Sequence, residues 1–159
     1  MLRPLFAGVL ALFAVGAVSM PPAAAQEAPL VANPTLTTIP LTLAAGGENH
    51  KYTVEVARTL TEQARGLMLR KTMARDHGMI FPLAVAREAD FWMEGTYLPL
   101  DIVFIAPDRT VRRIAANAVP FSRAGITSGG PVSAVLELNA GEAARIGLRP
   151  GDKVSYTLN

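Results

Sequence analysis

The segment that most restricts how this chain can fold is residues 99–105, which read Pro-Leu-Asp-Ile-Val-Phe-Ile. Consecutive side chains of a β-strand point to opposite faces, and the four residues 102–105 are all apolar. A strand that is apolar on both faces has to be covered on both sides. We therefore predict that this strand lies inside the domain, with other parts of the chain packed over each face.

Alternating apolar and polar residues predict further strands. Residues 39–43 and 52–56 alternate in this way, and the small residues 44–47 between them supply a turn, which predicts an antiparallel hairpin with one solvent-facing side. Residues 67–77 have no regular period but enough apolar side chains to form an ordered loop. Shorter candidate strands lie at 79–81, 89–93, 111–114, 132–138 and 153–158.

Two short helices are predicted from their capping residues. Thr59 and Glu62 have the spacing of a capping box, in which each side chain satisfies a free backbone amide at the start of a helix. Asn139 followed by Glu142 is a second cap signature. A glycine that can adopt the left-handed conformation follows each predicted helix, Gly66 and Gly147.

The N-terminal residues predict export from the cytoplasm. Residues 1–25 combine a basic start, an apolar run over 5–18 and the small residues before Gln26, which is the pattern of a secretory signal peptide. Cleavage after Ala25 would leave a flexible leader, residues 26–35, and a periplasmic or extracellular protein. An uncleaved membrane anchor is the alternative, although the apolar run is shorter than the ~20 residues of a spanning helix.

Composition excludes several classes of protein. The chain has no Cys, which excludes disulfides, zinc–thiolate sites, cysteine nucleophiles and lipoprotein acylation. Its 15 Lys and Arg nearly balance 13 Asp and Glu without forming a basic block, so no nucleic-acid partner is predicted. The two histidines, His50 and His77, do not have a metal-binding spacing, so we expect no metal and no cofactor.

Asp101 is the one polar side chain in the central apolar strand. A buried carboxylate without a partner costs several kcal/mol, so a partner is implied. The backbone amides of a turn at 95–98, an arginine such as Arg70, or a ligand could supply it. If 95–98 is a hairpin turn, Trp92 and Asp101 lie on adjacent strands near that turn, and Arg70 can reach the carboxylate from the loop before it.

The same region is the candidate site. Trp92, Glu94 and Asp101 would form an aromatic floor with two carboxylates, which is the minimum for general acid–base catalysis on a sugar. Arg70 would then hold an anionic ligand or pair with Asp101. The structural alternatives remain open: Trp92 as a core residue, Arg70 on a solvated loop and Asp101 bound to backbone amides.

Several blocks of sequence spread over residues 36–158 occur in a fixed order. They are Val-Glu-Val-Ala at 54–57, Gly-Leu-Met-x-Arg at 66–70, Gly-Met-Ile-Phe at 78–81, Phe-Trp-Met-x-x-Thr at 91–96, Pro-Leu-Asp-Ile-Val-Phe at 99–104, Val-Leu-Glu-Leu-x-Ala-Gly at 135–141 and Gly-Asp at 151–152. In this order they resemble the bacterial and archaeal family called domain of unknown function 192 (DUF192). The resemblance implies a compact β-sandwich or jelly-roll-like domain, often exported, without an established activity. The family usually has Lys-Asn-Thr where this chain has Glu94-Gly95-Thr96, so a ligand that needs the lysine is not expected.

These observations predict a mainly β fold: a single compact β-sandwich, jelly-roll-like or flattened-barrel domain with two short helices, over residues 36–159. We expect a soluble exported envelope protein that acts as a binding or accessory module, with a small cleft near Trp92 and Asp101. A cell-surface carbohydrate hydrolase using Asp101 and Glu94, and an interaction module without a pocket, are the alternatives. The candidate ligand-binding residues are Arg70, Trp92, Glu94, Thr96 and Asp101.

Overall fold

The computed structural model describes residues 30–158, in which nine strands and two short helices are found. The predicted signal peptide, residues 1–25, lies outside the described residues, as do the first residues of the predicted leader. In chain order the elements are β1 (Thr38–Ala45), β2 (Glu48–Val56), α1 (Leu60–Arg65), β3 (His77–Arg87), β4 (Asp90–Phe91), β5 (Leu100–Ile105), β6 (Val111–Ala118), β7 (Ile126–Thr127), β8 (Val132–Asn139), α2 (Glu142–Ile146) and β9 (Lys153–Tyr156).

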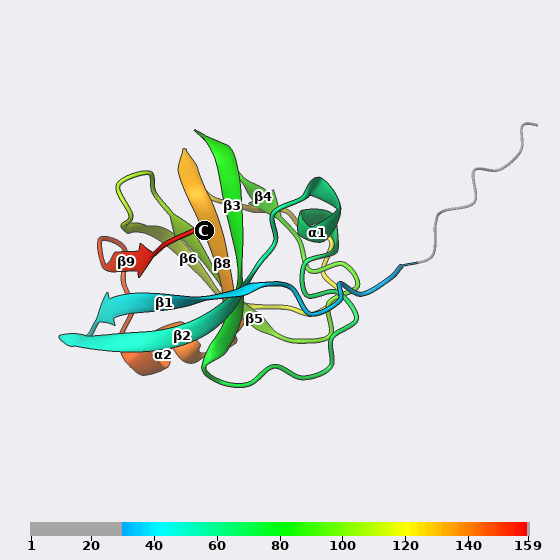
Figure 1. Ribbon diagram of the computed structural model, residues 1–159, viewed down its shortest axis with the longest axis horizontal. Helices are drawn as coiled ribbons and strands as arrows, with labels where there is room; N and C mark the ends of the chain where they lie inside the picture. The colour runs from blue at the N-terminus through cyan, green and yellow to red at the C-terminus, as the bar shows by residue number, and fades with distance from the viewer. Residues whose placement is uncertain (1–29, 159) are drawn as a thin grey trace, which may run out of the picture.

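Seven of these strands form one curled sheet in the order β6-β5-β8-β3-β2-β1-β9, and only β2 and β3 pair in parallel (Figure 1). The two edges of the sheet meet at one end, where the Val111 amide donates to the Asp152 carbonyl and the Val154 amide donates to the Arg109 carbonyl. Strands β4 and β7 form a separate two-stranded sheet. The predicted mainly β fold, with a curled and partly closed sheet, is confirmed.

Strand β5 is covered on both faces, as predicted, and all six of its residues are buried. Val103 and Ile105 pack in a core within the curve of the sheet, together with side chains of β1, β2 and α2. Ile102 and Phe104 pack in a second core on the other face, with Phe81 of β3 and residues that precede β5. This second core lies on the side of the sheet where α1 and β4 are found (Figure 1).

The elements with strong local signals form as predicted. Strands β1 and β2 make the antiparallel hairpin around the glycine turn. Thr59 and Glu62 form both hydrogen bonds of the capping box at the start of α1, and Gly66 follows the helix with a φ of 46°. Gly147 ends α2 in the left-handed conformation.

The predicted hairpin around residues 95–98 is wrong. Strand β4 pairs with β7, whereas β5 pairs with β6 on one edge and with β8 on the other. Both hydrogen-bonding edges of β5 are therefore occupied by later strands, which leaves no edge for the segment that contains Trp92.

The predicted cap of α2 is also wrong. The N-cap residue is Gly141, which makes no side-chain hydrogen bond to the helix. The Asn139 amide group donates instead to the backbone carbonyls of Met73 and Ala74, at 3.3 and 3.0 Å. These bonds tie the ordered loop before β3 to the end of β8.

The described part of the predicted leader is anchored to the domain. Asn33 is buried, and its side-chain nitrogen donates to the carbonyls of Glu62 and Gly66 at 2.8 and 3.0 Å. These carbonyls lie at the C-terminal end of α1, where a helix lacks internal donors. The segment around Asn33 therefore packs against α1.

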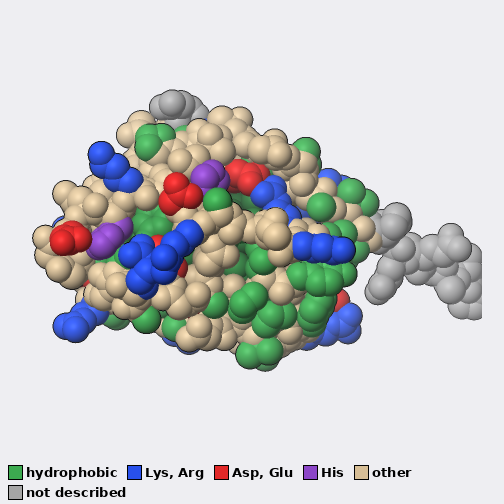
Figure 2. All heavy atoms as spheres, turned by 90° about the horizontal axis from the view of Figure 1, so that it is seen from below, with side chains coloured by type: hydrophobic (Ala, Val, Ile, Leu, Met, Phe, Trp, Pro, Cys, Tyr) green, Lys and Arg blue, Asp and Glu red, His purple; other side chains and the backbone are tan. Residues whose placement is uncertain are grey.

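In the view of Figure 2, acidic side chains and two histidines lie mainly on the left and near the centre, and hydrophobic side chains gather at the lower right. Basic side chains are spread over both sides. Trp92, Tyr97 and Phe121 are large exposed apolar side chains, and the rings of Tyr97 and Phe121 meet edge to face at 4.9 Å. None of the helices in residues 30–158 is long and apolar enough to span a membrane.

Candidate functional site

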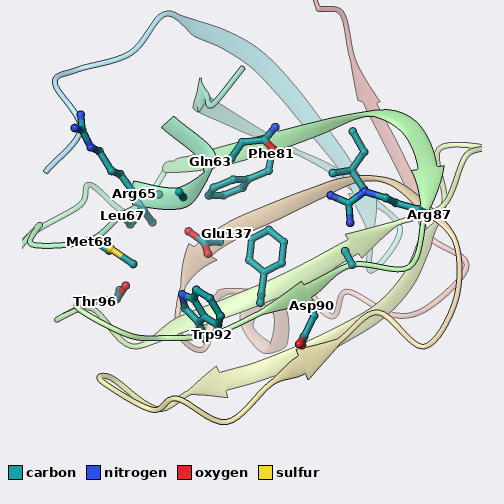
Figure 3. Close-up of a pocket in the computed structure, with 15 residues that line it drawn as sticks. Gln63, Arg65, Leu67, Met68, Phe81, Arg87, Asp90, Trp92, Thr96 and Glu137 are labelled. Carbon is teal, nitrogen blue, oxygen red and sulfur yellow. The ribbon is translucent and has the colours of Figure 1, made fainter. Parts of the chain in front are cut away.

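A pocket of about 200 Å³ opens into the second core, between α1, β3, β4 and the segment that leads to β5. Its lining combines apolar side chains with a few polar ones (Figure 3). The labelled lining residues are Gln63, Arg65, Leu67, Met68, Phe81, Arg87, Asp90, Trp92, Thr96 and Glu137.

The walls of the pocket are fixed by contacts to backbone and rings. The Gln63 amide donates to the carbonyls of Ala57 and Pro82, at 3.1 and 2.8 Å, and so holds α1 over β3. At the end of α1, a Cβ atom on Gly66 would lie 3.3 Å from Cζ of Phe81, so glycine allows this close approach. The ring of Phe81 meets the ring of Phe91 edge to face at 5.2 Å.

Glu137 lies at the base of the pocket, between the rings of Phe81 and Trp92 in Figure 3. It belongs to β8, where it pairs with Met79 of β3 and Ile102 of β5. The side chain is 5% exposed, and its Oε2 atom has no hydrogen-bond partner within residues 30–158. Burial raises the pKa of Glu137 to about 8, so the carboxyl group is mainly protonated at neutral pH.

The other buried carboxylates have partners. Asp101 Oδ1 accepts from the Asn117 amide and Oδ2 from the Ala143 amide, each at 2.8 Å. Glu142 accepts from the Tyr52 hydroxyl at 2.7 Å and from the Arg145 guanidinium. The hydrogen bonds from Arg145 and Tyr52 hold the pKa of Glu142 down, at about 2, against the opposing effect of burial.

Asp101 occupies a structural position. The pairing of β5 with β6 shifts register opposite Asp101, and Asn117 in that irregular stretch has a φ of 53°, which aims its amide at the carboxylate. The second bond, to Ala143, reaches the first turn of α2, where amides lack internal acceptors. The carboxylate thus joins a strand irregularity to a helix start, and it does not use the amides of residues 95–98 that we considered.

The predicted pairing of Arg70 with Asp101 is wrong. Arg70 forms a two-pronged ion pair with Glu55 of β2, with Nη2 donating to Oε2 at 2.8 Å. Glu55 also accepts from the Leu36 amide at 2.7 Å. Arg70 therefore fixes the loop after α1 to the C-terminal end of β2. It does not line the pocket.

Two of the five predicted site residues, Trp92 and Thr96, line the pocket. Trp92 is 55% exposed, so it is not a core residue. Thr96 is buried, and its hydroxyl lies 3.5 Å from the Glu94 carbonyl. The Glu94 carboxylate forms an ion pair with Arg123 outside the pocket lining. The structure thus keeps Trp92 and Thr96 together and separates Arg70, Glu94 and Asp101 from the lining.

The comparison with known families agrees with the resemblance seen in the sequence. The model of the family described as Uncharacterized ACR, DUF192, matches residues 41–156. The chain belongs to the DUF192 family. The match extends from β1 to β9 and so includes every strand that borders Glu137 and the pocket.

Two solved structures resemble this DUF192 domain. A protein from Sinorhizobium meliloti 1021, described as a candidate transcription regulator, is 45% identical with a TM-score of 0.75, over 78% of this chain and 97% of that one. A protein of unknown function from Novosphingobium aromaticivorans DSM 12444 is 44% identical, also with a TM-score of 0.75, over 82% of this chain and 94% of that one. No curated protein matches the chain.

Glu137 is the pocket residue that the sequence reasoning missed. The alternation of residues 132–138 predicted a strand, and no residue of that strand was among the predicted site residues. Glu137 has the same parity as Val135, and Val135 packs in the second core. Strand β8 lies between β5 and β3 in the sheet, so both of its faces are covered. The alternation of side chains that identified Asp101 as buried would therefore also have identified Glu137.

The arrangement does not form a metal site. Within the described range, no group of three or more His, Asp or Glu side chains could hold a metal ion. The pocket instead offers the buried carboxyl group of Glu137, which has no partner at Oε2 within residues 30–158, the Thr96 hydroxyl and the aromatic rings of Phe81, Phe91 and Trp92. These groups are suited to binding an organic molecule that has one polar end and an apolar body.

Proposed function

We propose that this DUF192 protein is an exported binding module of the cell envelope, and that it holds a small, partly apolar molecule in the pocket above Glu137. The observation that carries the proposal is the buried Oε2 atom of Glu137, which has no hydrogen-bond partner among residues 30–158 and lies in the lining of a pocket with both apolar and polar side chains. A buried polar atom without a hydrogen bond costs about 1–3 kcal/mol. A ligand that supplies the missing bond would recover this free energy on binding.

The size of the pocket limits the ligand. Sites for drug-sized molecules usually enclose about 300–1,000 Å³. The pocket here has about 200 Å³ and is open on one side. The ligand is therefore a small molecule, or the end group of a larger one whose remainder lies in solvent.

The alternatives have less support. A hydrolase that uses Asp101 with Glu94 would need both carboxylates beside the substrate, but neither lines the pocket and Asp101 already accepts two backbone bonds. The description of the Sinorhizobium protein suggests regulation through DNA. The helices of residues 30–158 contain six and five residues, which is short for a recognition helix in the major groove.

Export is the second part of the proposal, and the support for it is the signal-peptide pattern of residues 1–25. Mass spectrometry of the protein recovered from the cell envelope should find a chain that begins at Gln26, because the small residues before it form the cleavage site. A chain that retains Met1 and remains in the membrane fraction would contradict cleavage and favour the uncleaved anchor.

Ligand binding can be followed through Trp92, which is the only tryptophan in the sequence and lines the pocket. Titration with alcohols, acids and amines of four to six carbon atoms should change its fluorescence saturably for at least one chemical class. Ala64→Phe, at an exposed lining position of α1, should block the pocket and weaken this binding at least tenfold. Thr61→Phe is the matched control, because Thr61 is exposed on the same helix but does not line the pocket.

Two results would overturn the binding proposal. One is that no compound of the panel binds to the wild-type protein. The other is saturable binding that Ala64→Phe and Thr61→Phe leave equally strong, because this would place the ligand outside the pocket.

A further inference from the structure

We propose that the pocket selects a primary ammonium ion that carries a short apolar chain, with the Glu137 carboxylate as its counter-ion. The inference rests on the proposed function and adds the charge and chemical class of the ligand.

The deprotonated Glu137 carboxyl group needs a hydrogen-bond donor from the ligand. The Oε2 atom of Glu137 is buried without a partner within the described residues, and the side chain lies in the pocket lining. Thr96 adds a second oxygen to the same lining. A primary ammonium group has three donors and no acceptor, so it can bind the Glu137 carboxylate and still donate to other oxygens of the lining.

The aromatic rings of the lining favour a cation with an apolar chain. Phe81, Phe91 and Trp92 contribute rings, and Met68 contributes a polarisable sulfur atom. Aromatic faces attract cations electrostatically, and the attraction is greater where water is excluded. An apolar chain attached to the ammonium group would pack against the same side chains, so both parts of the proposed ligand find a matching surface.

The charged side chains of the lining differ in how they are placed relative to Glu137. The titratable groups that line the pocket with Glu137 are Arg65 of α1, Arg87 of β3 and Asp90 of β4. In Figure 3, the Arg65 side chain extends away from Glu137, and Asp90 also points away from it. Arg87 is exposed and donates to the Glu88 carbonyl at 3.2 Å. Glu137 is the titratable group at the base of the pocket, so its deprotonated form would repel an anion and attract a cation.

The volume sets the length of the chain. An apolar cavity of about 150 Å³ can hold one benzene molecule, and the pocket here has about 200 Å³. An ammonium group with about four carbon atoms fits this space.

Binding of an ammonium ion is coupled to the release of a proton. Burial raises the pKa of Glu137 to about 8, so the carboxyl group of the free protein is mainly protonated below that pH. The counter-ion role requires the deprotonated form, so affinity for the ammonium ion rises with pH below pH 8. The amine itself stays charged in this range, because an alkylamine such as Lys has a pKa near 10.4.

The test compares n-butylammonium with n-butanol and butyrate, which have similar size and shape, by titration of Trp92 fluorescence in the full mature protein. At pH 8, n-butylammonium should bind at least tenfold more tightly than either of the others. Between pH 6 and pH 8 its affinity should rise at least tenfold, while that of n-butanol changes by less than twofold. Glu137→Gln should reduce n-butylammonium to the affinity of n-butanol and remove the pH dependence.

The outcomes separate this inference from the proposed function. Equal binding of n-butylammonium and n-butanol, or tighter binding of butyrate, would overturn the charge selection and leave the pocket as a binding site. No binding of any of the three would overturn the charge selection, and no binding of any compound in the panel of four to six carbon atoms would overturn both. The wild-type pH series does not depend on how well Glu137→Gln folds, so an affinity for n-butylammonium that is constant from pH 6 to pH 8 also overturns the inference.

Discussion

Asp101, Glu137 and Glu142 are buried carboxyl groups that this fold treats differently. Asp101 binds two backbone amides, and Glu142 binds a tyrosine and an arginine. At both groups these hydrogen bonds replace the bonds to water that burial removes. Glu137 has no such replacement at Oε2, and burial raises its pKa. The contrast separates two acids that stabilise the fold from one that is available for binding.

Asp101→Asn should destabilise the protein by about 1.5–3 kcal/mol, which is typical for loss of a hydrogen bond to a charged group. Asparagine keeps one oxygen for the two amide donors of Asn117 and Ala143, and its own NH₂ group would then face one of them. Urea unfolding measures the change. The exposed Asp90→Asn is the control and should change stability by less than about 0.5 kcal/mol. Equal stabilities of the two variants would contradict the structural role of Asp101.

The pKa of Glu137 predicts a pH dependence of stability. The folded pKa is about 8 and the ordinary value is 4.5, so the folded protein holds this proton more tightly than the unfolded chain. The stability that Glu137 contributes is therefore fully present below about pH 4.5 and is lost as pH rises through 8. Glu137→Gln does not titrate, so its free energy of unfolding relative to wild type should increase with pH, by up to about 1.4 kcal/mol per pH unit.

Urea unfolding of both proteins at pH 5, 6.5 and 8 measures this difference. A difference that stays constant over the three pH values would show that Glu137 does not titrate in this range in the folded protein.

The alternation of side chains along a strand was sufficient to identify Asp101 as a buried carboxyl group, but it did not identify the hydrogen-bond partners of Asp101. The alternation of 99–105 predicted that Asp101 is buried and that backbone amides could satisfy it. The amides come from Asn117 and Ala143, which are 16 and 42 residues away in the chain, so no local pattern indicates them. Arg70 was assigned to Asp101 because of its charge, whereas Glu55 on β2 lies within its reach.

Secondary structure elements with local signals place one wall of the pocket. The capping box of Thr59 and Glu62 starts α1, and Gly66 ends it against Phe81. The sequence predicts these features because each depends on residues close together in the chain. The hairpin expected around 95–98 fails because the pairing of β5 with β6 and β8 is decided by distant segments. The cap expected at Asn139 fails because the Asn139 side chain donates to backbone carbonyls of the loop before β3.

Thr59→Ala should cost about 0.5–2 kcal/mol, because the Thr59 hydroxyl accepts from the Glu62 amide at 3.1 Å and no other side chain of the capping box replaces it. Thermal or urea unfolding measures the loss. Thr61→Ala, at an exposed position inside the same helix, should be neutral or slightly stabilising, since alanine has the higher helix propensity. If the two variants have the same stability, the capping box does not contribute to holding α1 at the pocket.

The whole molecule is a curled sheet with a core on each side, and the pocket belongs to the outer core. The inner core, within the curve of the sheet, is formed by side chains from β1, β2, β9 and α2 among others, whereas short elements and loops cover the outer face. The two-sided burial of 99–105 predicted that two cores exist, and it predicted nothing about which one contains a pocket. That depends on how α1, β4 and the segment before β5 meet over Glu137, and these contacts join parts of the chain with no common pattern.

The central claim is that the pocket above Glu137 binds a primary ammonium ion. A crystal structure of the mature protein grown at pH 8 with n-butylamine tests it most directly. We expect density for the amine in the pocket, with its nitrogen 2.7–3.2 Å from a carboxylate oxygen of Glu137 and its carbon chain against Phe81, Phe91 and Trp92. A structure in which the amine binds elsewhere, or in which the pocket contains only water, would contradict the claim.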